Sequence, residues 1–288
     1  MSMTQLTLRD ILIKSTGYLS QKRVDSPRLS AELVIAHALG VDRLALFLDP
    51  DKPLGENELA RIRPFLIRRG TGEPMAYILG HKEFYGLDFL VSKDVLIPRP
   101  DTELGVDLVL KSFPKERKLL FADVGSGSGA LAVTLLTKFP NGQAIATDIS
   151  LRTLGISKLN AQRHGVSERI LTVQGDLLKH LGSLCLDFII ANLPYISEDE
   201  ARTLSPEVIC YEPRQALIGG PKGDELFAPL LSDAMRVLKR GGCILLETGS
   251  TQAAAVHDHI QRISANWKRV RVHKDLSGLD RFVSAWWE

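Results

Sequence analysis

The chain lacks several features that mark whole classes of protein. Its 288 residues include only 3 cysteines and no C-x-x-C pair, so a disulfide framework is not predicted. No apolar run approaches the length that a membrane-spanning helix requires, and the first ten residues are too polar for a signal peptide. We therefore expect a cytoplasmic protein that makes no contact with a membrane.

An excess of charge of one sign is also missing. The 36 Lys and Arg residues almost balance the 34 Asp and Glu residues, which leaves a formal net charge of +2. This charge does not predict electrostatic capture of nucleic acid by the whole molecule, although a local basic patch stays open. The histidines are scattered, and His257 and His259 point to different sides of a helix, so no metal site is predicted.

The composition and length are those of a soluble globular protein with two domains. Hydrophobic residues make up 44% of the chain, which is ample for a sizeable core. The length suits a catalytic domain of ordinary size plus a smaller one. We predict a helical domain over residues 1–79, a bridging hairpin over 80–100 and a larger domain over 101–288. The hairpin is indicated by the alternating apolar residues Phe84, Leu87, Phe89 and Val91.

The first 79 residues have the apolar periodicity of helices. Three sets of residues each share one helical face: Leu8, Ile11 and Leu12; Leu29, Leu33 and Ala36; Ile62, Phe65 and Leu66. Ser26-Pro27 predicts the start of a helix with a side-chain cap, and Gly40 predicts its end. Four arginines are predicted to form a solvated helix face, with a docking surface for an acidic or ribosome-associated partner as the alternative: Arg61, Arg63, Arg68 and Arg69.

Strand-like and helix-like segments alternate through the larger domain. This alternation predicts a parallel sheet with helices on both faces. The last two strand-like runs, Trp267–His273 and Arg281–Trp287, flank Gly278 and can pair as an antiparallel hairpin. We therefore predict an α/β fold with a Rossmann-like, mostly parallel seven-stranded sheet and an antiparallel terminal hairpin, as in nucleoside-dependent methyltransferases.

A glycine-rich loop follows the first strand of the predicted sheet, with the sequence Asp123-Val124-Gly125-Ser126-Gly127-Ser128-Gly129. Glycines let backbone N–H groups approach a ligand closely, and the following helix offers a positive partial charge at its N-terminus. The spacing is G-x-G-x-G, whereas dinucleotide-binding proteins have G-x-G-x-x-G. It favours S-adenosylmethionine, whose ammonium Asp123 would hold directly or through water.

Two more acids lie at the ends of the next two strands. Asp148 can accept both ribose hydroxyls of a nucleoside, and Asp176 can accept from the adenine amino group, with Leu177 against the ring. Helix capping explains each acid taken singly. Their occurrence in order at successive strand ends favours the cofactor site, although an acid at the Asp148 position alone does not distinguish a nicotinamide cofactor.

The residues Asn192-Leu193-Pro194-Tyr195 follow the apolar run Leu186–Ala191, so they lie on a loop that leaves a buried strand, where open α/β sheets keep their chemistry. A planar amide nitrogen has no free lone pair, so its alkylation requires acceptors for its N–H groups and a flat surface beneath it. Asn192 Oδ1, the carbonyl of residue 193 or 194 and the Tyr195 ring can supply them. We predict that Asn192, Pro194 and Tyr195 are catalytic, that all four residues bind substrate and that Asn192 also borders the cofactor. The alternative is that Asn192 and Pro194 only end the strand.

Longer stretches resemble one family. They read GEPMAYILG over 72–80, EFYGL over 83–87, VLIPRPDTE over 95–103, YEPRQAL over 211–217 and LSGLDR over 276–281. With them, almost the whole chain resembles the HemK/PrmC-type peptide chain release factor N5-glutamine methyltransferases. The chain differs from the usual family pattern at Leu193, where a second proline is usual, and at Asp101, where glutamate is usual.

The resemblance implies a helical substrate-recognition domain joined by a hairpin to a class I, S-adenosylmethionine-dependent methyltransferase domain. It implies methyl transfer to the side-chain amide nitrogen of glutamine in the Gly-Gly-Gln loop of release factors, with S-adenosylhomocysteine as product. It places the cofactor loop on 125–129, the ribose acid on Asp148, the adenine contact on Leu177 and the glutamine-binding motif on 192–195.

Three other functions stay open. Asn-Leu-Pro-Tyr is also the motif of ribosomal RNA adenine dimethyltransferases, so an adenine N6-methyltransferase acting on RNA or DNA is the main alternative. The 72–103 segment and the helical domain favour glutamine, for which no direct nucleic-acid binding is required. A nicotinamide-dependent oxidoreductase is opposed by the glycine spacing, and a non-catalytic cofactor-binding module would leave Asn192 and Tyr195 without a role. Glu212 and Glu247 lie near predicted strand ends, but capping and sheet-edge solvation explain them equally well, so we leave both outside the predicted site.

Overall fold

The apolar periodicity of the first 79 residues corresponds to a helical unit in the computed structural model, which describes residues 6–183 and 186–288. The unit contains five helices in this part of the chain: α1 (Leu8–Gln21), α2 (Pro27–Leu39), α3 (Ala45–Leu48), α4 (Glu56–Gly70) and α5 (Met75–Leu79). Gly40 ends α2 in a left-handed conformation with φ 71°, as predicted. Ser26 is the N-cap of α2 and Pro27 its first residue, as predicted, but Ser26 has a left-handed φ of 47° and its side chain makes no capping hydrogen bond.

A later segment also belongs to the helical unit. The chain divides into one unit of Met1–Gly80 with Ser205–Tyr211, and a second of His81–Leu204 with Glu212–Glu288. Within the first unit, Arg69 Nη1 donates to Glu207 Oε2 of α10 (Pro206–Tyr211) at 3.0 Å, and the Tyr211 hydroxyl donates to the Thr71 carbonyl at 2.9 Å. The prediction of a solvated face is therefore wrong for Arg69, which is only 5% exposed.

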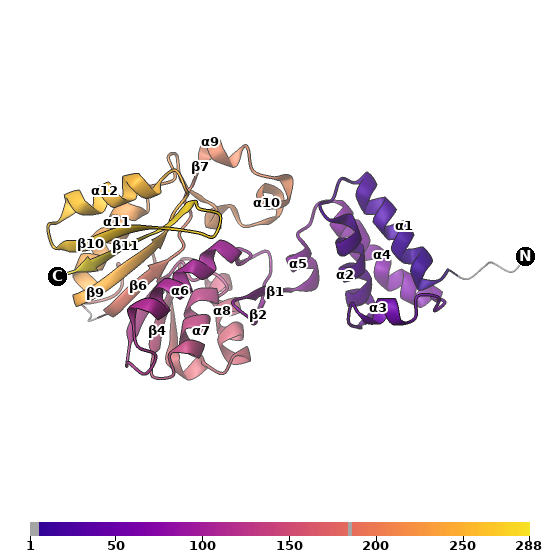
Figure 1. The fold of residues 1–288 in the computed structure, drawn as a ribbon, viewed down its shortest axis with the longest axis horizontal. Coiled ribbons are helices and arrows are strands. Elements are labelled where there is room, and N and C mark those ends of the chain that lie inside the picture. The colour runs from indigo at the N-terminus through magenta and orange to yellow at the C-terminus, as the bar shows by residue number, and fades with distance from the viewer. Residues whose placement is uncertain (1–5, 184–185) are drawn as a thin grey trace, which may run out of the picture. The chain divides into compact units, whose positions relative to one another are not determined.

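The second unit is built on a seven-stranded sheet (Figure 1). Its strand order is β10-β11-β9-β6-β3-β4-β5. The strands are β3 (Leu120–Val124), β4 (Gln143–Asp148), β5 (Ile170–Gln174), β6 (Leu186–Ala191), β9 (Leu238–Glu247), β10 (Trp267–Lys274) and β11 (Asp280–Trp287). Neighbours from β5 to β9 pair in parallel, whereas β11 pairs antiparallel with both β9 and β10. The predicted mostly parallel sheet with an antiparallel terminal hairpin is confirmed.

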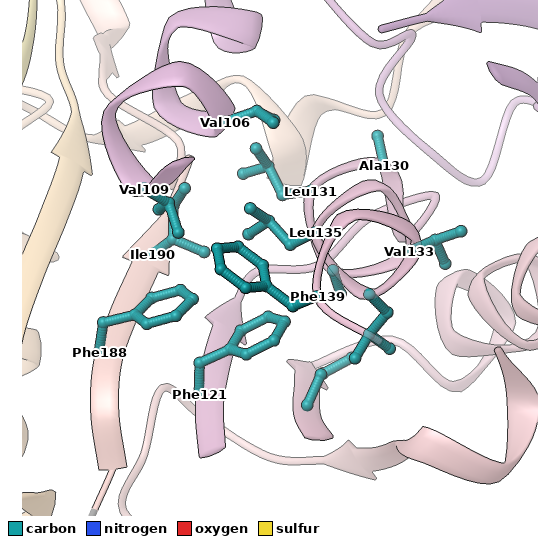
Figure 2. Packing of buried hydrophobic residues seen from close by; sticks show 14 of the residues in the cluster. Val106, Val109, Phe121, Ala130, Leu131, Val133, Leu135, Phe139, Phe188 and Ile190 are labelled. Carbon is teal, nitrogen blue, oxygen red and sulfur yellow. The ribbon is translucent and has the colours of Figure 1, made fainter. Parts of the chain in front are cut away.

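Alternate residues of the strands pack into two cores on opposite faces of the sheet. On one face, Phe121 and Phe188 stack with ring centroids 4.6 Å apart and pack with Val109 and Leu135 (Figure 2). These come from α6 (Glu103–Ser112) and α7 (Ala130–Lys138), and α8 (Leu151–Arg163) contributes to the same face. The other face is covered by α11 (Phe227–Val237) and α12 (Ala253–Ile263). Because side chains alternate along a strand, residue 121 faces one core and Ala122 the other.

The remaining elements connect or border the sheet. A separate hairpin forms from β1 (His81–Phe84) and β2 (Leu87–Leu90), and a short parallel pair forms from β7 (Ile196–Ser197) and β8 (Ile218–Gly220). The short helices are η1 (Pro100–Thr102), η2 (Ser167–Arg169), α9 (Glu198–Ala201) and η3 (Arg214–Ala216). Within residues 6–183 and 186–288, no helix is both long and apolar enough to span a bilayer.

The strand order reverses between β3 and β6, because the chain continues from β3 to β4 on one side and returns with β6 on the other. Ligands of open α/β sheets bind at the carboxyl ends of the strands beside such a reversal. This edge of the sheet is therefore the place to look for the site.

Candidate active site

A cavity of about 860 Å³ lies at the carboxyl ends of β3, β4, β5 and β6. Its volume is in the range of small-molecule and cofactor sites. Most predicted site residues line it: Asp123, Gly125, Ser126, Gly127, Ser128, Asp148, Asp176, Leu177, Asn192, Leu193 and Pro194. Gly129 and Tyr195 are the two predicted residues that are not part of its lining. The opposite wall comes from residues of the 94–102 and 213–220 segments.

The backbone conformation of the glycine loop explains the spacing of its three glycines. Gly125, Gly127 and Gly129 have φ values of 71°, 55° and 80°, a left-handed conformation that glycine adopts at little cost. Left-handed residues therefore alternate with ordinary ones, which is the G-x-G-x-G pattern. At Gly129, a Cβ atom would also lie 2.6 Å from Ser157 Oγ, so this glycine lets the loop approach α8.

Most backbone N–H groups of the loop bind protein rather than point freely at a ligand. Those of Gly125 and Ser126 both donate to the Thr147 carbonyl at 2.9 Å. That of Gly127 donates to Asp148 Oδ2 at 3.2 Å, and that of Gly129 donates to the Ser126 carbonyl at 2.7 Å. The expectation that the backbone N–H groups of the loop approach a ligand is therefore too broad. The loop is fastened to β4, and in the first turn of α7 the Ala132 N–H likewise donates to a protein group, Asp123 Oδ2.

The two acids at the ends of β3 and β4 are held by backbone donors. Asp123 is 1% exposed, and its Oδ2 accepts from the N–H of Ala132 in α7 at 2.9 Å. Burial, opposed by the hydrogen bond from Ala132 and assisted by the charge of Asp148, raises the pKa of Asp123 to about 7. Asp148 accepts from Ser150 N and Gly127 N, and burial raises its pKa too. A cationic group in the cavity would favour the charged form of both acids.

Asp176 and Leu177 border the same cavity but differ in burial. Asp176 is exposed and pairs with Lys179, whereas Leu177 is 6% exposed and packs into the core beneath α11. Leu177 also has a φ of 51°, a conformation that is costly for a residue with a branched side chain. The backbone here thus holds an apolar side chain at the cavity wall, as a contact for a flat ring requires.

Two buried hydroxyls in the cavity lining indicate that a polar cofactor fits the cavity. Ser126 Oγ and Thr147 Oγ1 belong to residues that line it, and neither has a hydrogen-bond partner among the described residues. Buried polar atoms of folded proteins are normally paired. Unpaired hydroxyls between two carboxylates and an apolar wall fit a ligand with polar, cationic and aromatic parts, such as S-adenosylmethionine. The described residues contain no group of three or more His, Cys, Asp or Glu that could hold a metal ion.

The loop after β6 places Asn192 against the residues before α6. Asn192 Nδ2 donates to Thr102 Oγ1 at 3.1 Å, so its Oδ1 lies at the other end of the planar amide. Leu193 is 4% exposed, and a Cβ at Gly125 would lie 3.0 Å from Leu193 Cδ2. Leu193, which stands where the resemblance leads us to expect a second proline, thus packs directly on the glycine loop.

Tyr195 is held by hydrogen bonds at both its hydroxyl and its carbonyl. Its hydroxyl donates to Glu247 Oε1 at 3.3 Å, and its carbonyl accepts from Gln252 Nε2 at 2.7 Å. Burial raises the pKa of the phenol, and the charge of Glu247 raises it further. The stacking of its ring on a substrate amide stays a prediction.

Almost the whole chain is similar to known proteins. A family model described as the PrmC N-terminal domain matches residues 10–80, and one described as the methyltransferase small domain matches residues 99–220. A protein of Nitratidesulfovibrio vulgaris named release factor glutamine methyltransferase is 41% identical over 285 residues, which are 99% of this chain and 96% of that protein. The chain belongs to the release factor glutamine methyltransferase family. A relative of the same name from Geobacter sulfurreducens is 39% identical over 96% of this chain and 95% of its own length.

A solved structure supports the fold of this family member. The crystal structure of a methyltransferase from Pyrococcus furiosus superposes with a TM-score of 0.52 at 20% identity, over 77% of this chain and 96% of that one. At this identity the likeness concerns the fold alone.

Four residues near the site of this family member were missed or set aside in the sequence. Thr102 bonds Asn192, and Glu247, 1% exposed, bonds Tyr195. Arg281 Nη2 lies 3.1 Å from Asp101 Oδ2. Glu212, 5% exposed, accepts from Ile97 N at 3.2 Å and pairs with Arg99 of the cavity wall. Thr102, Glu212 and Arg281 each lie in one of the family-like stretches, which was the available signal for them, whereas Glu247 lies outside those stretches.

Proposed function

We propose that this protein transfers a methyl group from S-adenosylmethionine to the side-chain amide nitrogen of the glutamine in the Gly-Gly-Gln loop of peptide chain release factors. The observation that carries the proposal is one cavity lined by both the glycine loop and Asn192, Leu193 and Pro194. It occurs in a chain whose full-length relatives are named release factor glutamine methyltransferases. The cytoplasmic location expected from the sequence belongs to the same proposal.

The cofactor would lie along the carboxyl ends of the strands. Asp123 would hold its ammonium, directly or through water, Asp148 its ribose hydroxyls, and Asp176 and Leu177 its adenine. Ser126 and Thr147 supply hydroxyls to its polar groups. When bound, S-adenosylmethionine supplies an electrophilic methyl carbon on a sulfonium centre.

Asn192 and a backbone carbonyl would then orient the substrate amide. Asn192 Oδ1 accepts one N–H of the glutamine side chain, and the carbonyl of residue 193 or 194 accepts the other. The nitrogen would then face the methyl carbon, and as the N–C bond forms and the sulfonium S–C bond breaks, S-adenosylhomocysteine would leave and the nitrogen would lose one of its two protons to solvent. Because the amide gains positive character as it attacks, these acceptors bind the transition state more tightly than the ground state. Holding the two reactants in this geometry supplies most of the rate.

Radiolabelled S-adenosylmethionine tests the proposal directly. The protein is incubated with a release factor, with the same factor carrying asparagine in place of the loop glutamine, with ribosomal RNA and with DNA. Label is expected on the unchanged factor alone, and peptide mass spectrometry should locate one methyl group on the glutamine. Label on the substituted factor would reject the glutamine assignment, and label on RNA or DNA would favour the adenine alternative.

A further inference from the structure

The proposed reaction needs Asn192 in one of its two amide orientations. The oxygen and nitrogen ends of an asparagine side chain are similar in size, and half a turn about the last bond exchanges them. With Oδ1 toward the substrate, Asn192 accepts an N–H of the glutamine. With Nδ2 there instead, two donors would face each other. The loop of residues 192–195, the proposed substrate-binding loop, therefore needs a neighbouring group that distinguishes Oδ1 from Nδ2 of Asn192.

The Thr102 side chain is that neighbour. Its Oγ1 accepts from Asn192 Nδ2 at 3.1 Å, which leaves Oδ1 for the substrate. Thr102 is 5% exposed and lines the cavity at the junction of η1 and α6. A hydroxyl, however, can donate as well as accept. Thr102 selects one orientation of Asn192 only if its own proton is given to another acceptor.

Glu247 at the end of β9 supplies that acceptor. Its carboxylate is 1% exposed, so water does not compete for it. It receives the Tyr195 hydroxyl at Oε1, at 3.3 Å, and its Oε2 has no hydrogen-bond partner among the described residues. Burial raises the pKa of Glu247 to about 7, whereas a hydrogen bond from Thr102, the charge of Arg281 and the Tyr195 hydroxyl lower it, and Asp101 raises it. The Tyr195 hydroxyl thus donates to Glu247, and Thr102 is close enough to the same carboxyl to lower its pKa.

We infer that Thr102 and Glu247 are positioning residues, which fix the Asn192 amide with its oxygen toward the substrate. Above about pH 7, where Glu247 is ionised, its carboxylate can only accept, and this sets the direction of the chain of hydrogen bonds. The Thr102 hydroxyl then donates to Glu247, its oxygen accepts from Asn192 Nδ2, and Asn192 Oδ1 accepts from the glutamine. Through Tyr195, the same carboxylate anchors the other end of the substrate-binding loop. This inference rests on the proposed function.

Substitutions at Thr102 separate the hydroxyl from the shape of the side chain. Thr102→Val keeps the shape, and we expect it to lower kcat roughly 10- to 100-fold while leaving S-adenosylmethionine affinity and the melting temperature near wild type. Thr102→Ser restores the hydroxyl and should recover most of the lost kcat. Glu247→Gln can donate as well as accept, so it should lower kcat roughly tenfold at unchanged cofactor affinity. The matched control is Thr134→Val, which removes a buried hydroxyl of α7 that has no partner among the described residues.

Two results would overturn the inference. One is a Thr102→Val enzyme whose kcat stays within about threefold of wild type, and the other is a Thr102→Ser enzyme as slow as Thr102→Val. A second measurement needs no activity: the side-chain amide signals of Asn192 in the ¹⁵N NMR spectrum of the full chain, assigned with Asn192→Ala. They should shift in Thr102→Val and stay unchanged in Thr134→Val, and identical signals in Thr102→Val would reject the contact. An inactive wild type would overturn the proposed function, while these signals would still decide the positioning role.

Discussion

The side chain of Asn192 carries the largest share of the proposed chemistry. It lines the cavity between the glycine loop and the 94–102 segment, and its amide is held at one end by Thr102. The other end is therefore preorganised as an acceptor before the substrate arrives. Preorganised polar groups cost no reorientation during the reaction, and single groups of this kind have large effects on rate.

Replacement of Asn192 by alanine should therefore abolish most turnover without loss of the cofactor. We expect kcat to fall roughly 10²- to 10³-fold, by analogy with the loss of one oxyanion-hole donor. Single-turnover methylation of a release factor and calorimetric titration with S-adenosylmethionine measure the two effects separately. Asn141→Ala, a substitution outside the cavity lining, is the matched control. Turnover within a few fold of wild type would rule out this role of Asn192.

The buried carboxyl of Asp123 predicts a pH-dependent affinity for the cofactor. Its pKa of about 7 in the free protein is caused by burial and then by Asp148. The proposed ammonium partner favours the ionised form, so binding lowers this pKa and releases a proton below about pH 7. Affinity should fall as pH drops below about 7, by up to about tenfold per pH unit, and be constant above it.

Calorimetry in buffers of different ionisation enthalpy measures both the affinity and the released proton. Asp123→Asn has the same shape without the ionisable group, so its affinity should be lower and its pH dependence weaker. What remains in that variant reports on Asp148. A wild-type affinity that does not change between about pH 5 and about pH 8 would contradict the assignment of Asp123 to the ammonium.

At the scale of elements, the backbone of β8 and of the turn after it packs closely against the loop of residues 192–195. A Cβ on Gly219 of β8 would lie 2.3 Å from the Pro194 carbonyl oxygen, and one on Gly223 would lie 2.3 Å from that of Tyr195. Such distances leave no room for a side chain. The glycines of β8 and the following turn therefore determine where the carbonyls of the loop lie.

The substitution Gly219→Ala should displace the loop and slow the reaction. A shift of about 1 Å in a positioned acceptor can cost roughly 10²-fold in rate, so we expect a loss of that size in kcat with the protein still folded. Gly155→Ala is the control, because this exposed glycine of α8 has no atom within 4 Å of its added Cβ. It should raise stability by about 0.5–1 kcal/mol and leave kcat unchanged. Equal kcat for the two variants would show that Gly219 does not support the loop.

The elements could be predicted from the sequence wherever their determinants are local. The succession of strands and helices along the chain and the G-x-G-x-G loop were predictable, because periodicity and glycine spacing reflect neighbouring residues. The partners of Asn192 were not, since Thr102 and Asn192 are 90 residues apart and only the folded sheet brings them together. Glu247 was set aside for the same reason. Its strand end was foreseen, but not its burial beside Tyr195.

At the scale of the whole molecule, the helical unit gains a segment from the later part of the chain. Arg69 is the main link, because its guanidinium bonds both Glu207 and the Glu73 carbonyl from a buried position. No local pattern in residues 205–211 predicted this membership. It arises from an ion pair between positions 138 residues apart in the sequence.

Removal of this link should loosen residues 205–211 selectively. Arg69→Met keeps an unbranched apolar stem but loses the donors, which should weaken local structure by about 1–3 kcal/mol. Hydrogen–deuterium exchange should then be faster across 205–211 and unchanged in β3 and β6. The exposed Arg63 of the same helix serves as control through Arg63→Met. Unaltered protection of 205–211 in Arg69→Met would contradict the prediction.

Residues 205–211, which belong to the helical unit, limit how this protein can be divided into fragments. A fragment that starts at residue 81 would retain residues 205–211 yet lose Arg69 and Thr71, to which Glu207 and Tyr211 bond. These seven residues, which lie in the sequence between the 192–195 loop and β8, would then lack their partners. Whether the helices recognise the substrate or only support the sheet is therefore best tested by single substitutions on exposed helix faces of the full-length protein.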